Sequence, residues 1–174
     1  MGMMRGGSSG NLMSGVIDEH FIEQMIPHHE GAIDMAQLAL ERSKRPEIRS
    51  LAEDIIEAQT REITQMKGWY GEWFNSEVPE YSRSGMGMMM GGGSNGHMMS
   101  FEGDLNDLKN AKDFDLEFIR QMIPHHEMAI MMASMLKVAS ARNEMQELAD
   151  QIIDSQSREV GMMQDWYKQW SVAN

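Results

Sequence analysis

The amino-acid sequence predicts an all-α protein built as a four-helix bundle, and three observations lead to this fold class. Residues 18–73 align with residues 115–170 at an offset of 97 without a gap, and 28 of the 56 paired positions are identical. Apolar residues recur at helical spacing through both aligned segments. A glycine-rich stretch separates the two segments. The chain therefore contains an internal duplication, in which each copy supplies two helices.

The first copy, 18–73, predicts a hairpin of two amphipathic helices. Residues 18–43 and 48–73 each carry an apolar stripe, and Asp18 suits the N-cap of the first helix. Only a few residues, around Ser43 to Glu47, separate the two stripes, so the helices are expected to fold back on each other.

The second copy, 113–170, predicts the same hairpin, with helices near 113–140 and 144–170. The stretch 74–112 contains GMGMMMGGGSNGHMM, which is too rich in glycine for a stable helix and is expected to be a mobile loop. Such a long crossover can join opposite ends of a bundle, as in ferritin-like folds. We expect a single domain over 18–174, preceded by a flexible Met/Gly-rich tail over 1–17.

Pro27 and Pro124 fall inside the first helix of each copy, directly before a His-His pair. One interpretation is a continuous helix with a kink, because proline removes a backbone hydrogen bond. The other is that proline begins a new helix, at the position where it is tolerated. In both cases the histidines lie within one turn of the irregularity.

The composition indicates which partners the protein can have. A formal net charge of −12 argues against nucleic acid, and the sequence contains no candidate membrane span. Cysteine is absent and methionine supplies 21 residues. Thioethers survive where thiols are oxidised, so the composition favours a periplasmic or secreted protein. No signal peptide is visible, so an exported protein with this sequence is expected to be the processed form.

The Met-Ile-Pro-His-His block, present in both copies, suggests a soft-metal site. Residues three, four and seven apart share a helix face, so each copy has a Met, His, Met stripe with a second histidine beside it. Imidazole with thioether favours Cu(I) and Ag(I), and Cu(II) on the histidines is an alternative. The competing interpretation is that the methionines only fill the core. The candidate ligands are Met25, His28, His29, Met35, Met122, His125, His126 and Met132.

Other methionines are further candidates. Met128, Met131 and Met135 form a stripe towards the outer face of their helix, which is either a partner surface or an extra soft-metal site. Met66 and Met163 could complete a metal shell from the facing helices. The remaining candidates lie in the loop and the tail and belong to no core, and a low-complexity linker is their alternative: Met86, Met88, Met89, Met90, His97, Met98, Met99, Met1, Met3 and Met4.

Polar residues recur on the inward faces of the second and fourth helices. Gln59 and Glu62 in the first copy match Gln156 and Glu159 in the second. Buried polar groups need partners, so we interpret the glutamates as groups that orient a histidine outside the ligand shell itself. A structural ion pair with arginine is the alternative. The four tryptophans are expected to cap the bundle ends.

The sequence argues against the enzymes that a ferritin-like bundle often carries. Di-iron oxidases need Glu-x-x-His on two helices, whereas this chain has Met25-x-x-His28 and Met122-x-x-His125 and no Glu-x-x-His. We therefore predict a non-enzymatic metal binder. The alternatives are a helical interaction module with a Met-rich surface and a metal-dependent redox enzyme.

These blocks resemble the bacterial family known as domain of unknown function number three hundred and five. Its hallmark, FIxQMIPHHEGAIxMA followed by QxREIxxMxxW, is matched by FIEQMIPHHEGAIDMA with QTREITQM and Trp69, and by FIRQMIPHHEMAIMMA with QSREVGMM and Trp166. The resemblance implies a ferritin-like bundle, periplasmic or released, that binds Cu(I) and Ag(I). It also implies a part in copper resistance beside an efflux system or a metallochaperone, with binding at the eight ligands of the two Met, His, Met stripes.

Overall fold

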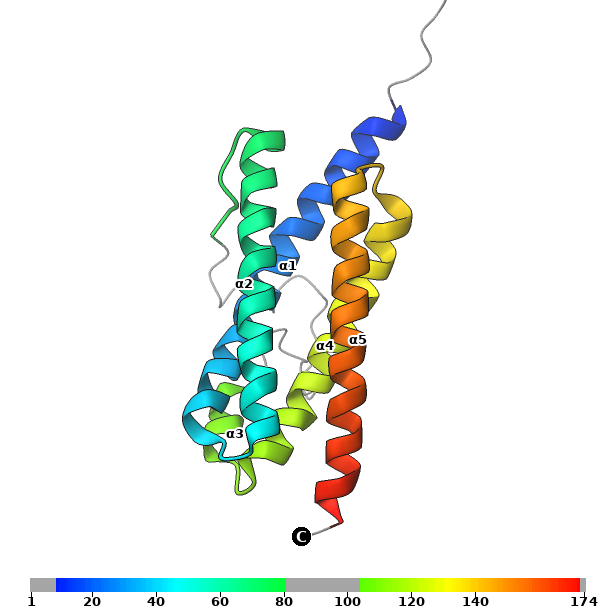
Figure 1. The fold of residues 1–174 in the computed structure, drawn as a ribbon. Helices are drawn as coiled ribbons and strands as arrows, with labels where there is room; N and C mark the ends of the chain where they lie inside the picture. The colour runs from blue at the N-terminus through cyan, green and yellow to red at the C-terminus, as the bar shows by residue number, and fades with distance from the viewer. Residues whose placement is uncertain (1–8, 81–103, 173–174) are drawn as a thin grey trace, which may run out of the picture.

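The structure, a computed structural model, describes residues 9–80 and 104–172. These residues form helices and no strand, which confirms the all-α prediction. The helices are α1 (Ser9–Arg42), α2 (Pro46–Phe74), α3 (Leu105–Asn110), α4 (Phe114–Ala139) and α5 (Asn143–Ser171), shown in Figure 1.

Two helical hairpins make up the bundle. α1 packs against α2, and α4 packs against α5. The hairpins meet through α1 and α4, which run antiparallel through the middle of the molecule, inclined to α2 and α5 (Figure 1). The predicted hairpins and the predicted bundle are therefore both present.

The connection between the hairpins joins opposite ends of the bundle, as its length led us to predict. Arg45, in the turn between α1 and α2, forms an ion pair of 3.2 Å with Asp115 at the start of α4. The start of α4 thus lies beside the start of α2, at the far end from Phe74 (Figure 1).

Two segments differ from the expected boundaries. α1 begins at Ser9, inside the expected flexible tail, and Asp18 lies within the helix instead of capping it. Tertiary contacts explain the extension, because the Ser14 hydroxyl accepts a hydrogen bond of 2.8 Å from the backbone N–H of Ala141. The expected loop contains α3, whose N-cap Asp104 accepts bonds from two backbone N–H groups of its first turn.

Both prolines lie inside continuous helices. α1 passes through Pro27, and α4 passes through Pro124. The interpretation in which each proline begins a separate helix is therefore wrong. The Pro-His-His blocks occupy the middle of α1 and α4, where the two hairpins meet.

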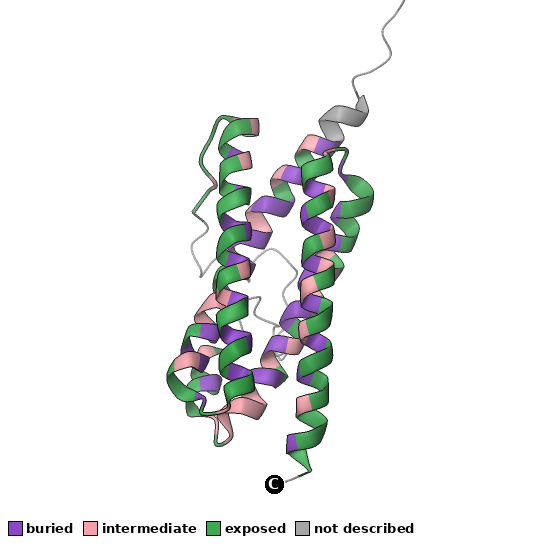
Figure 2. Ribbon diagram, viewed as in Figure 1, coloured by how far each residue is buried: buried purple, intermediate pink, exposed green. Residues whose placement is uncertain are grey.

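The buried face of each long helix points inward (Figure 2). The core consists of two apolar clusters. Each cluster joins the first half of one inner helix to the second half of the other: Phe21 and Met25 lie with Ala133 and Leu136, and Phe118 and Met122 lie with the α1 residues from Ala32 to Ala39. Each cluster combines opposite halves of the two inner helices because α1 and α4 run antiparallel. No described helix is long and apolar enough to cross a membrane.

Candidate metal centre

A polar layer separates the two apolar clusters. On each of the four long helices, two polar residues lie between the positions that contribute to one cluster and those that contribute to the other. The layer consists of His28, His29, Gln59, Glu62, His125, His126, Gln156 and Glu159. All are buried except Glu159, which is half-buried. The four candidate histidines therefore share one level of the bundle with the glutamines and glutamates that were predicted to lie beside them.

His28 and His125 are in contact where α1 meets α4. Their ring centroids are 3.7 Å apart, with a tilt of 38° between the ring planes. Burial is the main cause that lowers the pKa of His28 to about 3, and the nearby His29 and His126 lower it further. His28 therefore stays neutral at physiological pH, the state in which an imidazole can bind a metal ion.

His29 and His126 each bond a glutamate of the neighbouring helix. The Nε2–H of His29 donates to Oε2 of Glu62, and that of His126 donates to Oε2 of Glu159, both at 2.6 Å. In the neutral tautomer that donates from Nε2, the lone pair is on Nδ1. The prediction that the glutamates orient histidines agrees with this geometry, in which an imidazole and not an arginine is the partner.

Several buried acceptor atoms in this layer form no hydrogen bond within residues 9–80 and 104–172. They include Nδ1 of His29, Nδ1 of His126 and the amide oxygens of Gln59 and Gln156. A buried polar atom without a partner costs about 1–3 kcal/mol. The two Nδ1 lone pairs are therefore suited to accept a ligand such as a metal ion.

The buried methionines divide between the two clusters in a way that the stripes on single helices did not reveal. Met25 and Met66 belong to one cluster, against which the half-buried Met132 of the other copy packs. In the other cluster the matching set is Met122 and Met163 with Met35. Each copy thus contributes two thioethers to one set and one thioether to the other. We name these sets half-site A (Met25, Met66, Met132) and half-site B (Met122, Met163, Met35).

The remaining candidate methionines are either on the surface or outside the described residues. Met128 is half-buried, whereas Met131 and Met135 are exposed. The loop and tail candidates, Met88, His97 and Met98 among them, lie outside the described residues.

The sequence interpretation missed two ion-pair contacts that join the hairpins. Arg45 lies 4.1 Å from the ring centroid of Trp170 and pairs with Asp115, and Arg142 lies at the same distance from Trp73 and pairs with Asp18. All these residues are identical between the copies. Their retention at the 97-residue offset was the signal that could have identified them.

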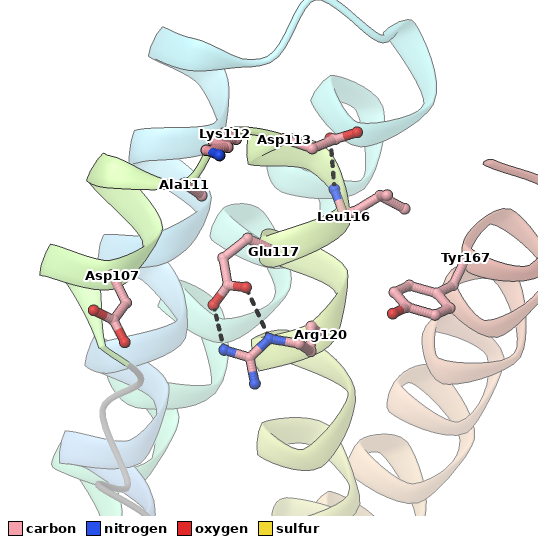
Figure 3. Close-up of a pocket in the computed structure, with 8 residues that line it drawn as sticks. All are labelled: Asp107, Ala111, Lys112, Asp113, Leu116, Glu117, Arg120 and Tyr167. Carbon is pink, nitrogen blue, oxygen red and sulfur yellow. Dashed lines mark hydrogen bonds and ion pairs between the residues drawn. The ribbon is translucent and has the colours of Figure 1, made fainter. Parts of the chain in front are cut away.

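A surface pocket at the junction of α3, α4 and α5 is a separate feature (Figure 3). It has a volume of about 380 Å³, and its lining contains no methionine or histidine. Arg120 forms two hydrogen bonds with Glu117 across one wall. Within the described part of the chain, no three His, Cys, Asp or Glu side chains gather in a metal-binding arrangement.

Comparison with known proteins gives relatives over most of the chain. Structures of CopM in Cu(II)-bound, Cu(I)-bound and Ag-bound forms are 47 to 50% identical to it, with TM-scores of 0.74 to 0.76. These matches cover 88% of this chain and 96 to 97% of CopM. A DUF305 fragment from Deinococcus radiodurans is 29% identical, covers 88% of this chain and 96% of the fragment, and has a TM-score of 0.69.

A shorter match is the uncharacterized protein L153 of Acanthamoeba polyphaga mimivirus. It is 45% identical over 49 residues, which are 28% of this chain and only 32% of the viral protein. The family model described as "Domain of unknown function (DUF305)" matches residues 18–172, which include both copies of the duplicated segment. The chain belongs to this family.

Proposed function

We propose that this protein binds Cu(I), and also Ag(I), through the imidazoles of the polar layer and the thioethers of half-sites A and B. The observation that carries the proposal is the position of six candidate thioethers, five buried and one half-buried, on either side of a histidine layer with two unpartnered Nδ1 atoms. The similarity to CopM, whose structures contain copper or silver, supports it.

The donor set matches soft ions. Thioether sulfur and neutral imidazole nitrogen bind Cu(I) and Ag(I), whereas Mg²⁺, Ca²⁺ and Mn²⁺ prefer carboxylate and carbonyl oxygen. Glu62 and Glu159 bond the outer ring nitrogens of His29 and His126, which fixes the rings in the way that metal-ligating histidines require. Cu(II) on the histidines is a further form of the same activity.

The biological role that we propose is a non-catalytic buffer or carrier of copper in the periplasm or outside the cell, contributing to copper resistance. A copper efflux system or a metallochaperone is the proposed partner. The absence of cysteine and the abundance of methionine support this location, because thioethers bind soft metals where thiols would be oxidised.

Anaerobic titration with Cu(I) against a chromophoric chelator tests this function, with Zn²⁺ and Mn²⁺ as controls. Removing one thioether from each half-site, by Met25→Leu with Met122→Leu, should weaken Cu(I) binding at least about tenfold while preserving apolar volume. Met145→Leu is the matched control, because Met145 is equally buried in the same cluster as half-site A but is not one of the candidate ligands. Equal affinities for the wild type and the double variant would contradict the proposal.

A second candidate function is a helical interaction module. Met131, Met135 and Val138 are exposed along α4, and methionine suits adaptable binding surfaces. If this is the main function, Cu(I) and Ag(I) should leave the thermal stability of the protein unchanged, because ligands that bind the folded state raise it.

A further inference from the structure

The outer face of α4 carries methionines that are continuous with half-site A. Met128, Met131, Met132 and Met135 are each three or four residues from two others of the set, so all four are neighbours on the helix surface. We call this set the α4 methionine ladder. Its members pass from solvent to core: Met135 and Met131 are 67% and 50% exposed, and Met128 and Met132 are half-buried.

The inner end of the ladder reaches the buried thioethers. Met132 packs against the cluster that contains Met25 and Met66, both of which are fully buried. A soft ion that moves along the ladder therefore meets sulfur ligands at every stage between solvent and half-site A. An ion bound by thioethers exchanges one neutral ligand for another, so no proton and no electron has to be transferred at any step.

Half-site B has no corresponding ladder. The positions equivalent to Met128, Met131 and Met135 are Gly31, Asp34 and Leu38. Gly31 is buried, and Leu38 is buried in the core cluster that also contains Leu108 of α3. The two half-sites thus have similar thioether sets but differ in their access to solvent.

We propose that the α4 methionine ladder is an uptake and release path for Cu(I) and Ag(I) that serves half-site A. This proposal rests on the proposed function. The ladder binds the ion transiently through its two exposed thioethers and the half-buried Met128. It then passes the ion to Met132, from which Met25 and Met66 take it. Half-site B lacks this path and exchanges its ion more slowly.

Stopped-flow measurement of Ag(I) or Cu(I) transfer from a chromophoric chelator tests the path. The variant Met131→Leu with Met135→Leu keeps an apolar surface but removes the two exposed thioethers. In the faster kinetic phase, the rate of metal loading and the rate of metal release should both fall by about tenfold. This is within the range that association rates of related variants cover. The equilibrium affinity and the number of tightly bound ions should stay unchanged, because a path alters both rates by the same factor.

Met162→Leu is the control, since Met162 is an exposed methionine on α5 outside the ladder. It should load at the wild-type rate. A wild-type rate in the double ladder variant would overturn the path. Loss of one tightly bound ion in that variant would also overturn it, because the ladder would then be a storage site. Failure of the proposed function would be evident separately, as absence of Cu(I) and Ag(I) binding in the wild type.

Discussion

On the α1 side of the bundle, Leu38 lies under α3 and is 8% exposed, whereas its counterpart Met135 on the α4 side is 67% exposed. At the centre the copies are alike, since His29 and His126 form the same 2.6 Å bond with a glutamate. The duplicated segments have therefore retained their inward contacts and diverged on their outer faces. The outer faces beside the two half-sites differ for this reason, although their methionine sets are matched.

The largest expected effect is a difference in stability between substitutions at Leu38 and at its counterpart Met135. Leu38→Ala removes a buried side chain from a core cluster and should lower the free energy of unfolding by about 3 kcal/mol, as for other buried leucines. Met135→Ala changes an exposed side chain and should stay within about 0.5 kcal/mol of the wild type. Urea denaturation of both variants measures the difference. Equal losses would mean that α3 does not protect Leu38 in solution.

The second prediction concerns the histidine layer that the copies share. Because burial lowers the pKa of His28 to about 3, only the unfolded chain takes up this proton as the pH falls below about 6.5. The stability contributed by neutral His28 is present above that pH and is lost on acidification, at about 1.4 kcal/mol per pH unit. Between pH 7 and pH 5 the free energy of unfolding should fall by about 2 kcal/mol from this group.

Denaturation curves at a series of pH values provide the measurement. His28→Gln should show a smaller acid dependence than the wild type, because the titrating group is absent. His20→Gln changes an exposed imidazole and is the control that should retain the full dependence. A His28→Gln protein as acid-sensitive as the wild type would show that His28 is not a buried neutral group in solution.

Most of the fold could be predicted because it depends on local and repeated information. The helical period placed α2, α4 and α5 within about two residues of their observed ends, the accuracy that boundary assignments allow. The N-terminal extension of α1 was missed, because it depends on contacts of Ser14 and Asp18 with residues more than a hundred positions away. No local pattern encodes such contacts.

The site illustrates the same limit. Residue types and spacing identified the histidines, the methionines and the two glutamates, but they suggested that Met25 and Met35 serve one stripe. Because α1 and α4 run antiparallel, the start of one helix lies beside the end of the other, and Met35 joins Met122 instead. The ligand set assigned to each half-site therefore needs the tertiary structure, and metal binding by these residues stays a prediction.

The smallest expected effect is a difference in stability between substitutions of Arg45 and Arg142, whose contacts join the hairpins. Arg45→Ala removes a cation–π contact with Trp170 and a partly exposed ion pair, at about 1 kcal/mol. Arg142→Ala should cost about 1 kcal/mol more in urea denaturation, because it leaves the fully buried Asp18 without its cation. Burial raises the pKa of Asp18, so protonation favours the folded state and the excess should shrink as the pH falls. If the difference in unfolding free energy between the two variants does not change with pH, a charged Asp18 is not its cause. If both variants lose the same unfolding free energy, the two contacts are equivalent.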